Sequence, residues 1–494
     1  MAISDPTHSS QTPEPGAVPP ARAGQIDASL KTPVLFFFAC AVLWLLLGSA
    51  LGVISAIKLH APEFLGNVEA LTFGRTRSMH LNIVAYGWTF NGVFGISLWL
   101  MHRLGRVELR NGWVAILGGG LWNVAVALGI GGILLGKMTS VEWLEMPKEV
   151  APLLAVAFLL IGTWNVVGFA RRAPGHVYVS QWYIIAAMFW LPMLYCVAEM
   201  MILWFPARGT VQAITNWWFA HNVLGLWMTP VGVAAMYYLI PKVLGKPIHS
   251  YYLSIIGFWS LALFYNWAGV HHLIGGPIPV WAQSAGIVAS IMMVVPVLVT
   301  AINFHTTTYG KENWRIIWNS PTLRFVVFGA FNYTLSSFAG SAMALREVNR
   351  VTHFTNFTVG HAHHGMYAFV AMVYFGAMYF IMPRLLGREW PSAALIKIHF
   401  WLTAGGIFFY VLVMSIHGIL QGMAMNDATT PFLEISRNAM VWNGLRTAGG
   451  TAMTLGHVAF AVHFFWMLRG SAASRRRTAP TLFSSAVPVE GGAR

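Results

Sequence analysis

The stretch YNWAGVHH occupies residues 265–272, near the end of a long apolar segment. Two adjacent imidazoles inside a membrane segment are unfavourable unless something binds them. Neighbouring helical side chains diverge by about 100°, but near the end of a helix they can converge on one ion. Tyr265 precedes His272 by almost two full turns, so both project from one face. The stretch therefore predicts a metal site with a proton-carrying phenol beside it.

The composition of the whole chain is that of a protein which crosses a membrane many times. The chain has 494 residues, of which 57% are hydrophobic and only 9% are charged, whereas a soluble domain carries about 25% charged residues. This length accommodates about twelve spans of ~20 residues with their loops. The net charge of +14 would suit a nucleic acid, but the basic residues stand in short loops between apolar runs. We therefore expect an all-α, polytopic membrane protein that binds no nucleic acid.

Twelve apolar runs predict the helices and the domain boundaries. They lie near 34–57, 79–101, 111–135, 150–171, 177–205, 214–241, 251–275, 278–303, 322–345, 357–383, 394–420 and 437–468. Lys and Arg are concentrated in alternate loops, which fits both termini being cytoplasmic. Residues 33–469 are the predicted helical domain. It is flanked by a disordered cytoplasmic tail at 1–32 and a basic cytoplasmic tail at 470–494.

Cysteine usage limits where haem can be attached. Cys40 and Cys196 are the only cysteines, and both stand inside apolar runs. They cannot form a disulfide framework, a Cys-rich zinc site or a C-x-x-C-H haem attachment. A covalently attached c-type haem would therefore have to reside on another subunit.

Six of the 18 histidines share one depth, toward the outer ends of four predicted helices. A lone histidine at such a depth is more often a hydrogen-bonded interfacial side chain. Six at one depth, including an adjacent pair and an H-x-H motif, favour metal binding. They are His80, His221, His271, His272, His361 and His363.

The H-x-H motif of His361 and His363 predicts two metals on opposite sides of one helix. Residues two apart project about 200° apart, so they cannot easily share one ion. That geometry suits two haems, each held by an axial imidazole. A low-spin haem needs a second axial ligand, for which His80 is the candidate, whereas a high-spin haem leaves one face open to a gas.

The remaining three histidines form a candidate three-nitrogen site that faces the open haem. His221, His271 and His272 suit copper or zinc on ligand type alone. Beside a haem and a tyrosine, redox-active copper is the better choice.

These motifs resemble subunit I of the haem-copper oxidases, and most closely the cytochrome cbb3 type, or C class. The resemblance runs from about Phe73 to Arg446 and rests on four segments. They are FGRTRSMH at 73–80, WWFAHN at 217–222, YNWAGVHH at 265–272 and GHAH at 360–363. The resemblance implies the twelve-helix bundle of that subunit, in the bacterial cytoplasmic membrane.

The resemblance also implies a role for each candidate residue. It assigns low-spin haem b to His80 and His363, high-spin haem b3 to His361, and copper B to His221, His271 and His272. Tyr265 matches the active-site tyrosine, which in this class is cross-linked to a copper ligand, here His221. Its implied role is to deliver an electron and a proton for splitting the O–O bond.

The implied function is that of a terminal respiratory oxidase, which reduces O2 to water and translocates protons. Electrons would come from membrane-anchored c-type cytochrome subunits. The alternative is a nitric oxide reductase on the same scaffold, which usually has non-haem iron and glutamates near the second metal. No Glu follows His221 within two turns, and Tyr265 holds the oxidase's tyrosine position. A transporter or a simple dihaem electron carrier is a further alternative, but neither needs this group of residues.

Hydroxyl groups on the helix at 251–275 form a candidate proton path. Tyr251, Ser254, Tyr265 and His272 fall within a ~60° sector of that helix. The stripe runs from the predicted cytoplasmic end up to the metal site, and a hydroxyl ladder with waters can carry protons through an apolar bundle. The alternative is that Tyr251 and Ser254 are ordinary interfacial residues.

Several charged residues lie at the depth expected for haem propionates. Arg77 and Arg446 are the best candidates, and Arg75, Arg346 and Arg350 are the others. A contact with solvent or with a lipid headgroup is the alternative for each arginine. The loop with Glu142 and Glu145 resembles the region from which this class supplies an acidic calcium ligand, with solvated loop acids as the alternative.

The chain departs from the family at two positions. The C class normally has a Glu within a Phe-Glu-Gly segment of the ninth helix, where this sequence reads Phe338-Ala339-Gly340. The methyl group of Ala339 cannot accept a hydrogen bond or carry charge, so the tuning of the proximal side of haem b3 must differ. His364 also follows the H-x-H motif where the family usually has a small residue.

Overall fold

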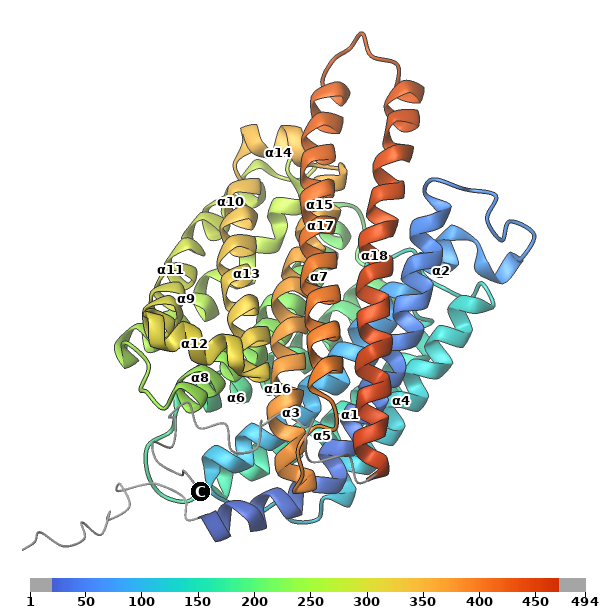
Figure 1. Ribbon diagram of the computed structural model, residues 1–494. Coiled ribbons are helices and arrows are strands. Elements are labelled where there is room, and N and C mark those ends of the chain that lie inside the picture. The colour runs from blue at the N-terminus through green and yellow to red at the C-terminus, as the bar shows by residue number, and fades with distance from the viewer. Residues whose placement is uncertain (1–19, 471–494) are drawn as a thin grey trace, which may run out of the picture.

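The computed structural model describes residues 20–470, which form a bundle of long helices without a β-strand (Figure 1). The helices are α1 (Pro20–Lys58), α2 (Phe73–Asn82), α3 (Phe90–Gly105), α4 (Trp113–Leu134), α5 (Ala151–Ala170), α6 (Val179–Ala198), α7 (Thr210–Val223), α8 (Thr229–Leu244), α9 (Tyr251–Ala268), α10 (Val280–Met292), α11 (Val294–Thr308), α12 (Lys311–Asn319), α13 (Pro321–Met343), α14 (Arg346–Thr352), α15 (Asn356–His363), α16 (Met372–Leu386), α17 (Ala393–Met425) and α18 (Phe432–Arg469).

Several helices are joined end to end by short segments of different pitch. The π-helical segments are η2 (Ile83–Thr89), η4 (Glu199–Trp204), η5 (Leu224–Met228) and η7 (His364–Ala371). Shorter 3₁₀ turns are η1 (Glu69–Leu71), η3 (Lys148–Val150) and η6 (Gly269–Leu273). The last of them directly follows α9. We call the end of the bundle at which α1 begins and α18 ends the terminal end, and the opposite end the distal end (Figure 1).

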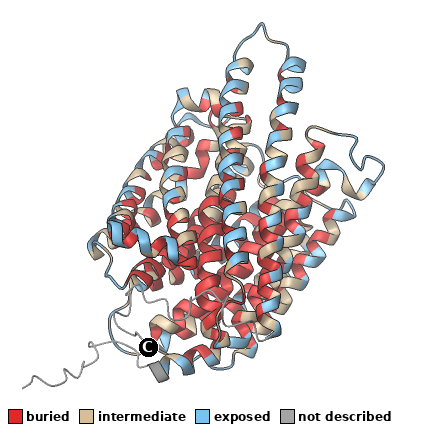
Figure 2. Ribbon diagram, in the orientation of Figure 1, coloured by how far each residue is buried: buried red, intermediate tan, exposed pale blue. Residues whose placement is uncertain are grey.

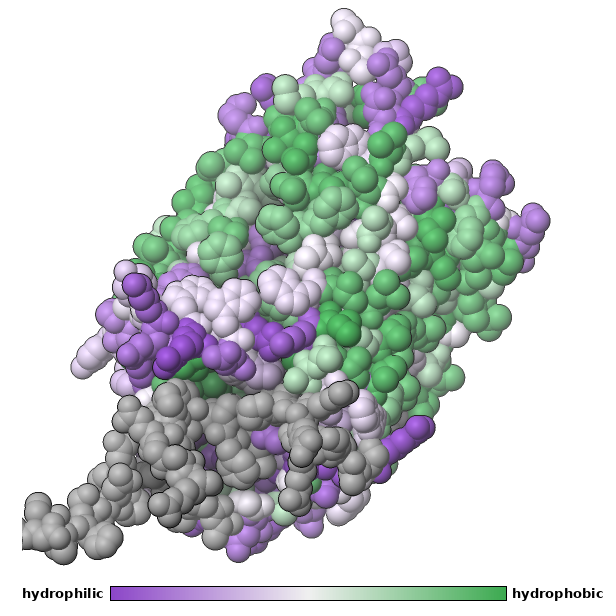
Figure 3. Space-filling model, in the orientation of Figure 1, coloured by the Kyte–Doolittle hydropathy of each residue, from purple (hydrophilic) through white to green (hydrophobic). Residues whose placement is uncertain are grey.

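The prediction of an all-α, polytopic membrane protein is confirmed. Within residues 20–470, 11 helical stretches are long and apolar enough to cross a membrane. The predicted span near 322–345 corresponds to α13, which has 23 residues but includes a polar run from Asn332 to Ser341. In Figure 3, hydrophobic side chains cover the middle of the visible face and hydrophilic ones gather toward its ends, as a bilayer requires.

The prediction that residues 1–32 form a disordered tail is wrong for its last part, because α1 begins at Pro20. Ile26 and Leu30 are fully buried there. Asp27 accepts hydrogen bonds from Trp99 Nε1 at 3.0 Å and from Arg103 Nη1 at 2.9 Å. These contacts hold the start of α1 against α3. The polar composition of this segment does not by itself indicate a helix. Residues 1–19 and the predicted tail from residue 471 lie outside the described residues.

Three helices form the centre of the bundle. α3, α8 and α16 are buried around nearly their whole circumference and contact one another (Figure 2). Helices that are apolar on all sides belong in such an interior, whereas the surrounding helices leave one apolar face for lipid. Each central helix directly follows a π-helical segment, namely η2, η5 and η7. The three segments lie above the central helices, on their distal side.

Candidate metal centre

A cavity of about 670 Å³ lies in the distal half of the bundle, above the central helices. Its walls are mostly apolar, which excludes bulk water from whatever it holds. All seven residues predicted for the metal and haem sites line it. They are His80, His221, Tyr265, His271, His272, His361 and His363.

The three candidate copper ligands converge within this cavity. One ligand atom from each of His221, His271 and His272 lies within 4.8 Å of the others. His271 and His272 stand in η6, so the backbone departs from the α-helix where two adjacent imidazoles have to point the same way. The ring centroids of this pair are 4.4 Å apart. His221 reaches them from α7, and its Nδ1 is buried without a hydrogen-bond partner, which a metal would satisfy.

A serine that was not predicted orients one of these ligands. His271 Nδ1 lies 2.7 Å from Ser290 Oγ on α10, and Ser290 donates its own proton to Gly286 O at 2.7 Å. The serine lone pair therefore accepts the Nδ1 proton of His271. This leaves Nε2 free for a metal, an arrangement typical of metal-ligating histidines.

Tyr265 lies directly against His221. The two rings are nearly parallel, with centroids 4.6 Å apart. The phenol fits only because position 225 is glycine: a Cβ there would overlap Tyr265 Cε1 and Cζ. Gly225 is four residues after His221, one helical turn away. A glycine one turn after a candidate ligand could have indicated that another side chain packs there. The sequence analysis did not predict this contact.

The two candidate ligands of the low-spin haem have fixed orientations. His80 Nδ1 donates to the carbonyl oxygen of Gly48 at 2.8 Å, and His363 Nδ1 donates to that of Val359 at 2.9 Å. A carbonyl oxygen can only accept, so both imidazoles present an unprotonated Nε2. A Cβ at Gly52 would lie 2.7 Å from the His80 ring, so this glycine makes room for the imidazole. The pair fits bis-imidazole ligation of a haem iron.

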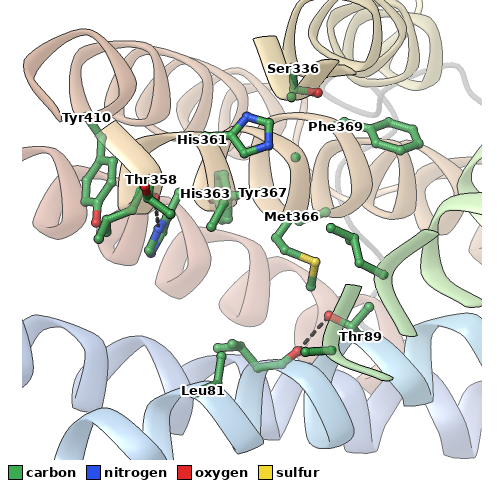
Figure 4. A pocket seen from close by; sticks show the side chains of 18 of the residues that line it. Leu81, Thr89, Ser336, Thr358, His361, His363, Met366, Tyr367, Phe369 and Tyr410 are labelled. Atoms are coloured by element: carbon green, nitrogen blue, oxygen red, sulfur yellow. Dashed lines mark hydrogen bonds between the residues drawn. The ribbon is translucent and has the colours of Figure 1, made fainter. Parts of the chain in front are cut away.

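His361 and His363 lie on different sides of their helix, as the H-x-H spacing predicts. Figure 4 shows His361 on the side of Ser336 of α13, and His363 on the side of Tyr410 of α17. The His363 and Tyr410 ring centroids are 4.7 Å apart. His361 Nδ1 is buried without a hydrogen-bond partner. Ala339, where the resemblance implies a glutamate, carries no side-chain hydrogen-bond acceptor.

Each π-helical segment above the centre begins just after a candidate ligand. η2 begins three residues after His80, η5 three residues after His221, and η7 directly after His363. A π segment inserts an extra residue into a turn and re-aims the side chains around it, and such segments are frequent at functional sites. The three helices that carry these ligands, α2, α7 and α15, are thus each joined to a central helix by a π-helical segment.

The structure separates the five candidate arginines into two groups. Arg77 and Arg446 line the cavity, and Arg77 Nη2 pairs with Glu142 Oε1 at 2.8 Å. Arg446 lies over the ring of Tyr410 at 5.6 Å, next to His363. The other three lie away from the cavity lining, and of these Arg75 pairs with Glu69 and Arg350 with Glu347.

The two loop acids near the cavity differ in environment. Glu142 lines the cavity beside Arg77, whereas Glu145 is 2% exposed and accepts a hydrogen bond from Asn82 Nδ2 at 2.9 Å through Oε2. Glu145 Oε1 has no hydrogen-bond partner. Burial raises the pKa of Glu145 to about 7. A cation would satisfy this oxygen, so Glu145 is the better placed of the two candidate calcium ligands.

The hydroxyl groups at the start of the predicted stripe on α9 donate to backbone carbonyls rather than to each other. Ser254 Oγ donates to Tyr251 O at 2.5 Å, and Tyr251 Oη donates to Val177 O at 3.1 Å. Beyond Ser254 the polar groups come from other helices. Asn303 Nδ2 donates to Tyr237 Oη at 3.3 Å, and Tyr333 lines the cavity beside Tyr265. Sequence reasoning missed these groups because they lie on α8, α11 and α13.

Comparison with known proteins places the chain in one family. The family model described as "Cytochrome C and Quinol oxidase polypeptide I" matches residues 32–452. The "Cbb3-type cytochrome c oxidase subunit CcoN1" of Stutzerimonas stutzeri is 33% identical over 404 residues, or 80% of this chain and 85% of that protein. The "Cytochrome c oxidase subunit 1 homolog, bacteroid" of Bradyrhizobium diazoefficiens is 31% identical over 477 residues, or 92% and 85% of the two chains.

The fold has a counterpart among solved structures. A structure of a heme-copper terminal oxidase dimer matches with a TM-score of 0.75, over 94% of this chain and 87% of that one, at 15% identity. This likeness concerns the fold, while the family model and the relatives concern the sequence itself. The chain belongs to the haem-copper oxidase subunit I family.

Proposed function

We propose that the chain is the catalytic subunit of a cbb3-type terminal oxidase, which reduces O2 to water and couples this reaction to proton translocation. Membership of the family makes it an oxidoreductase subunit that binds haems and copper. One observation carries the finer proposal: His221, His271 and His272 converge within 4.8 Å, with Tyr265 stacked on His221. A tyrosine next to a three-histidine site suits the cleavage of a bond between two oxygen atoms.

The residues of the cavity fit the groups that the family implies. His80 and His363 would hold low-spin haem b, His361 would hold high-spin haem b3, and the three converging histidines would hold copper B. When bound, these groups supply electron transfer and a place for O2 to react. The apolar walls of the cavity keep bulk water from the reacting atoms.

The role of Tyr265 is to hold and release a proton next to the copper site. Its ring packs against Gly225 and His221, which would hold its hydroxyl in one place relative to the three imidazoles. The cross-link to His221 would fix that position further. Tyr251 and Ser254 would begin the route by which protons reach Tyr265 from the terminal end, because both lie on the helix that carries Tyr265.

The basic residues at the terminal end support a cytoplasmic orientation for it. Arg103, Lys242 and Arg384 end three central helices there, and Arg469 ends α18. Both termini of the chain would then be cytoplasmic, in a bacterial inner membrane. Electrons would enter from c-type cytochrome subunits anchored in the same membrane, since the sequence has no C-x-x-C-H motif to attach such a haem.

Charged groups at the distal end suit the acidic parts of the haems. Arg77 and Arg446 would face the propionates, because both line the cavity. Glu145, with one oxygen unpaired, would bind a calcium ion. Calcium would be detected by its retention after dialysis of the purified protein, and lost in Glu145→Gln.

Nitric oxide reduction is the competing activity on this scaffold. Among the described residues, the single acid that lines the cavity is Glu142, and it is paired with Arg77. No glutamate therefore faces the three histidines, which favours copper and oxygen chemistry. Metal and haem analysis of the purified complex, paired with O2 and NO uptake, tests the proposal. Two haems and one copper with O2 uptake lost in Tyr265→Phe would support it, whereas iron with NO turnover preferred would reject it.

A further inference from the structure

A second cavity, of about 440 Å³, lies on the outside of the bundle between α1 and α18. These two helices run side by side (Figure 1), and both are long and apolar enough to cross a membrane. The cavity is an outward-facing groove, because Val458, Val462 and Trp466 in its wall are 46%, 55% and 38% exposed. It shares no lining residue with the cavity of the candidate metal centre, so the proposed function does not use it.

A small side chain makes the groove deep. Ala461 of α18 is 3% exposed and lines the groove together with the larger side chains of Leu46 on α1 and Phe465 on α18. A hollow of this kind in a face that meets the hydrocarbon of a bilayer holds no bulk water. Left empty, its walls would also lose their dispersion contacts. An apolar chain that enters the groove from the bilayer restores these contacts.

The groove is about as long as one leaflet of a bilayer. On α18 it extends from Val458 to Arg469, which at the α-helical rise is roughly 16 Å. The hydrocarbon core of a bilayer is about 30 Å thick, so one leaflet contributes about 15 Å. A transmembrane helix of another subunit would need a contact of about twice this length. The dimensions therefore favour a single acyl chain.

The end of the groove at the terminal end of the bundle is positively charged. Arg469 is the last residue of α18 and, among the described residues that line the groove, the single charged one. Within residues 20–470 its guanidinium is paired with no carboxylate. Trp466 lies about one turn deeper, and tryptophan is enriched at the level of the lipid headgroups. Arg469 is thus placed to bind a phosphate group.

A second arginine adds positive charge at this end. Arg388 Nη2 donates to the carbonyl oxygen of Leu468 at 3.2 Å, so Arg388 lies beside the end of α18 that carries Arg469. The acid next to it in the sequence is Glu389, which lies close enough to Arg384 to offset the charge of that residue. An excess of positive charge at headgroup depth favours a lipid with a net negative charge over a zwitterionic one.

We propose that the groove between α1 and α18 is a binding site for an anionic phospholipid. One acyl chain lies along Ala461 and Val462, and the phosphate group pairs with Arg469. The tendency of basic residues to gather on one side of a membrane accounts for an arginine at this end of α18 but not for the groove beside it. The inference depends on the protein crossing a membrane and not on the proposed function.

The charge of the ligand is tested by native mass spectrometry of the purified, delipidated full complex in detergent. We expect one phosphatidylglycerol to bind the parent about fivefold or more tightly than phosphatidylethanolamine binds, since one basic residue near the surface contributes about this factor. Arg469→Gln should lower the affinity for phosphatidylglycerol about fivefold. Arg110→Gln, at an exposed arginine of the loop after α3, is the matched control and should bind like the parent. Equal affinities for the two lipids, or no effect of Arg469→Gln, would overturn the proposal.

The groove itself is tested by filling it. Val462→Trp places a large ring in the groove and should weaken the binding of phosphatidylglycerol about tenfold or more. Because Val462 is 55% exposed, the larger side chain does not have to enter the core. Val288→Trp on α10, where the valine is 59% exposed and lines neither cavity, is the matched control. The unfolding temperature in detergent verifies that both variants fold, and equal binding by the two would overturn the assignment of the site to this groove.

A cross-link separates a lipid from a transmembrane helix of another subunit. Val462→Cys, with Cys40→Ser and Cys196→Ser, allows a benzophenone to be attached at the groove, and Val288→Cys in the same background is the control. After photolysis in membranes, we expect lipid adducts at both positions, with a higher fraction of phosphatidylglycerol at position 462. Equal fractions at the two positions would overturn the proposal. A cross-link from position 462 to a protein subunit would overturn it as well and would assign the groove to a partner helix.

Discussion

The phenol ring of Tyr265 fills the space that a side chain at Gly225 would occupy. The glycine lies one turn after His221, in the π-helical segment η5. Tyr265, His221 and Gly225 therefore depend on one another. Because Gly225 has no side chain, the phenol can lie next to the copper site. The dependence of the tyrosine on this glycine leads directly to a substitution test.

Gly225→Ala should displace Tyr265 while leaving the six histidines in the sequence. Because a shift of about 1 Å at a reacting group can cost a hundredfold in rate, we expect O2 uptake to fall about a hundredfold. The measurement is O2 consumption, with the haem spectrum as the check on assembly. Gly131→Ala on α4 is the control, since a Cβ at Gly131 meets nothing within 4 Å. Equal activity in both variants would show that Tyr265 does not depend on Gly225.

Ser290→Ala should weaken metal binding although it leaves all three candidate copper ligands in place. The variant removes the acceptor that holds the Nδ1 proton of His271. Loss of such a partner typically lowers metal affinity about 10- to 100-fold. Copper retention against increasing concentrations of a chelator measures this. Ser260→Ala on α9, where the hydroxyl bonds Ile256 O, is the matched control and should retain copper like the parent. Copper retention in Ser290→Ala equal to that of the control would remove Ser290 from the site.

The long helices and the six histidines could be predicted because both contrast with their surroundings. Apolar runs of about 20 residues are unmistakable, and His80, His221 and the rest stand out as polar groups inside them. Gly225 and Gly52 do not stand out, because the chain has 48 glycines and their effect depends on a ring from another helix. The π-helical segments leave no sequence mark either, since tertiary contacts determine where a turn widens.

At the start of α1 the sequence analysis predicted a disordered tail where the structure has a helix. Residues 20–32 are polar enough to be taken for a tail, yet Asp27 is buried against Trp99 and Arg103 of α3. A buried ion pair is invisible in a one-dimensional pattern, because its partner lies 76 residues away.

Asp27→Ala should destabilise the bundle more than the loss of an exposed acid. The Asp27 and Arg103 side chains are 10% and 15% exposed, so removing the acid leaves a nearly buried guanidinium unpaired. Such a loss costs about 3 kcal/mol or more. Glu347→Ala is the control, because the Glu347 and Arg350 side chains are 85% and 70% exposed and such a pair contributes about 1 kcal/mol at most. The unfolding temperature in detergent measures both, and equal shifts would show that Asp27 does not anchor α1.

The stability of the protein should fall as pH rises through the range in which Glu145 ionises. Burial raises the pKa of this carboxyl from 4.5 to about 7. The folded protein therefore favours the protonated acid, and its contribution to stability is full below pH 4.5 and is lost progressively up to about pH 7. A shift of this size corresponds to roughly 3 kcal/mol across the window. The unfolding temperature, measured against pH with a chelator present to remove calcium, reports this loss.

Glu145→Gln should flatten that dependence, because an amide keeps the size of the acid and cannot ionise. Asn82 donates to the carboxylate at present and can donate equally to the amide oxygen. Glu69→Gln, at an exposed acid of η1, is the matched control and should keep the pH dependence of the parent. Added calcium should raise the stability of the parent above pH 7 but not that of Glu145→Gln, since a cation at the unpaired oxygen favours the ionised form. A parent whose unfolding temperature does not vary between about pH 4.5 and about pH 7 would show that Glu145 is already ionised in the folded protein.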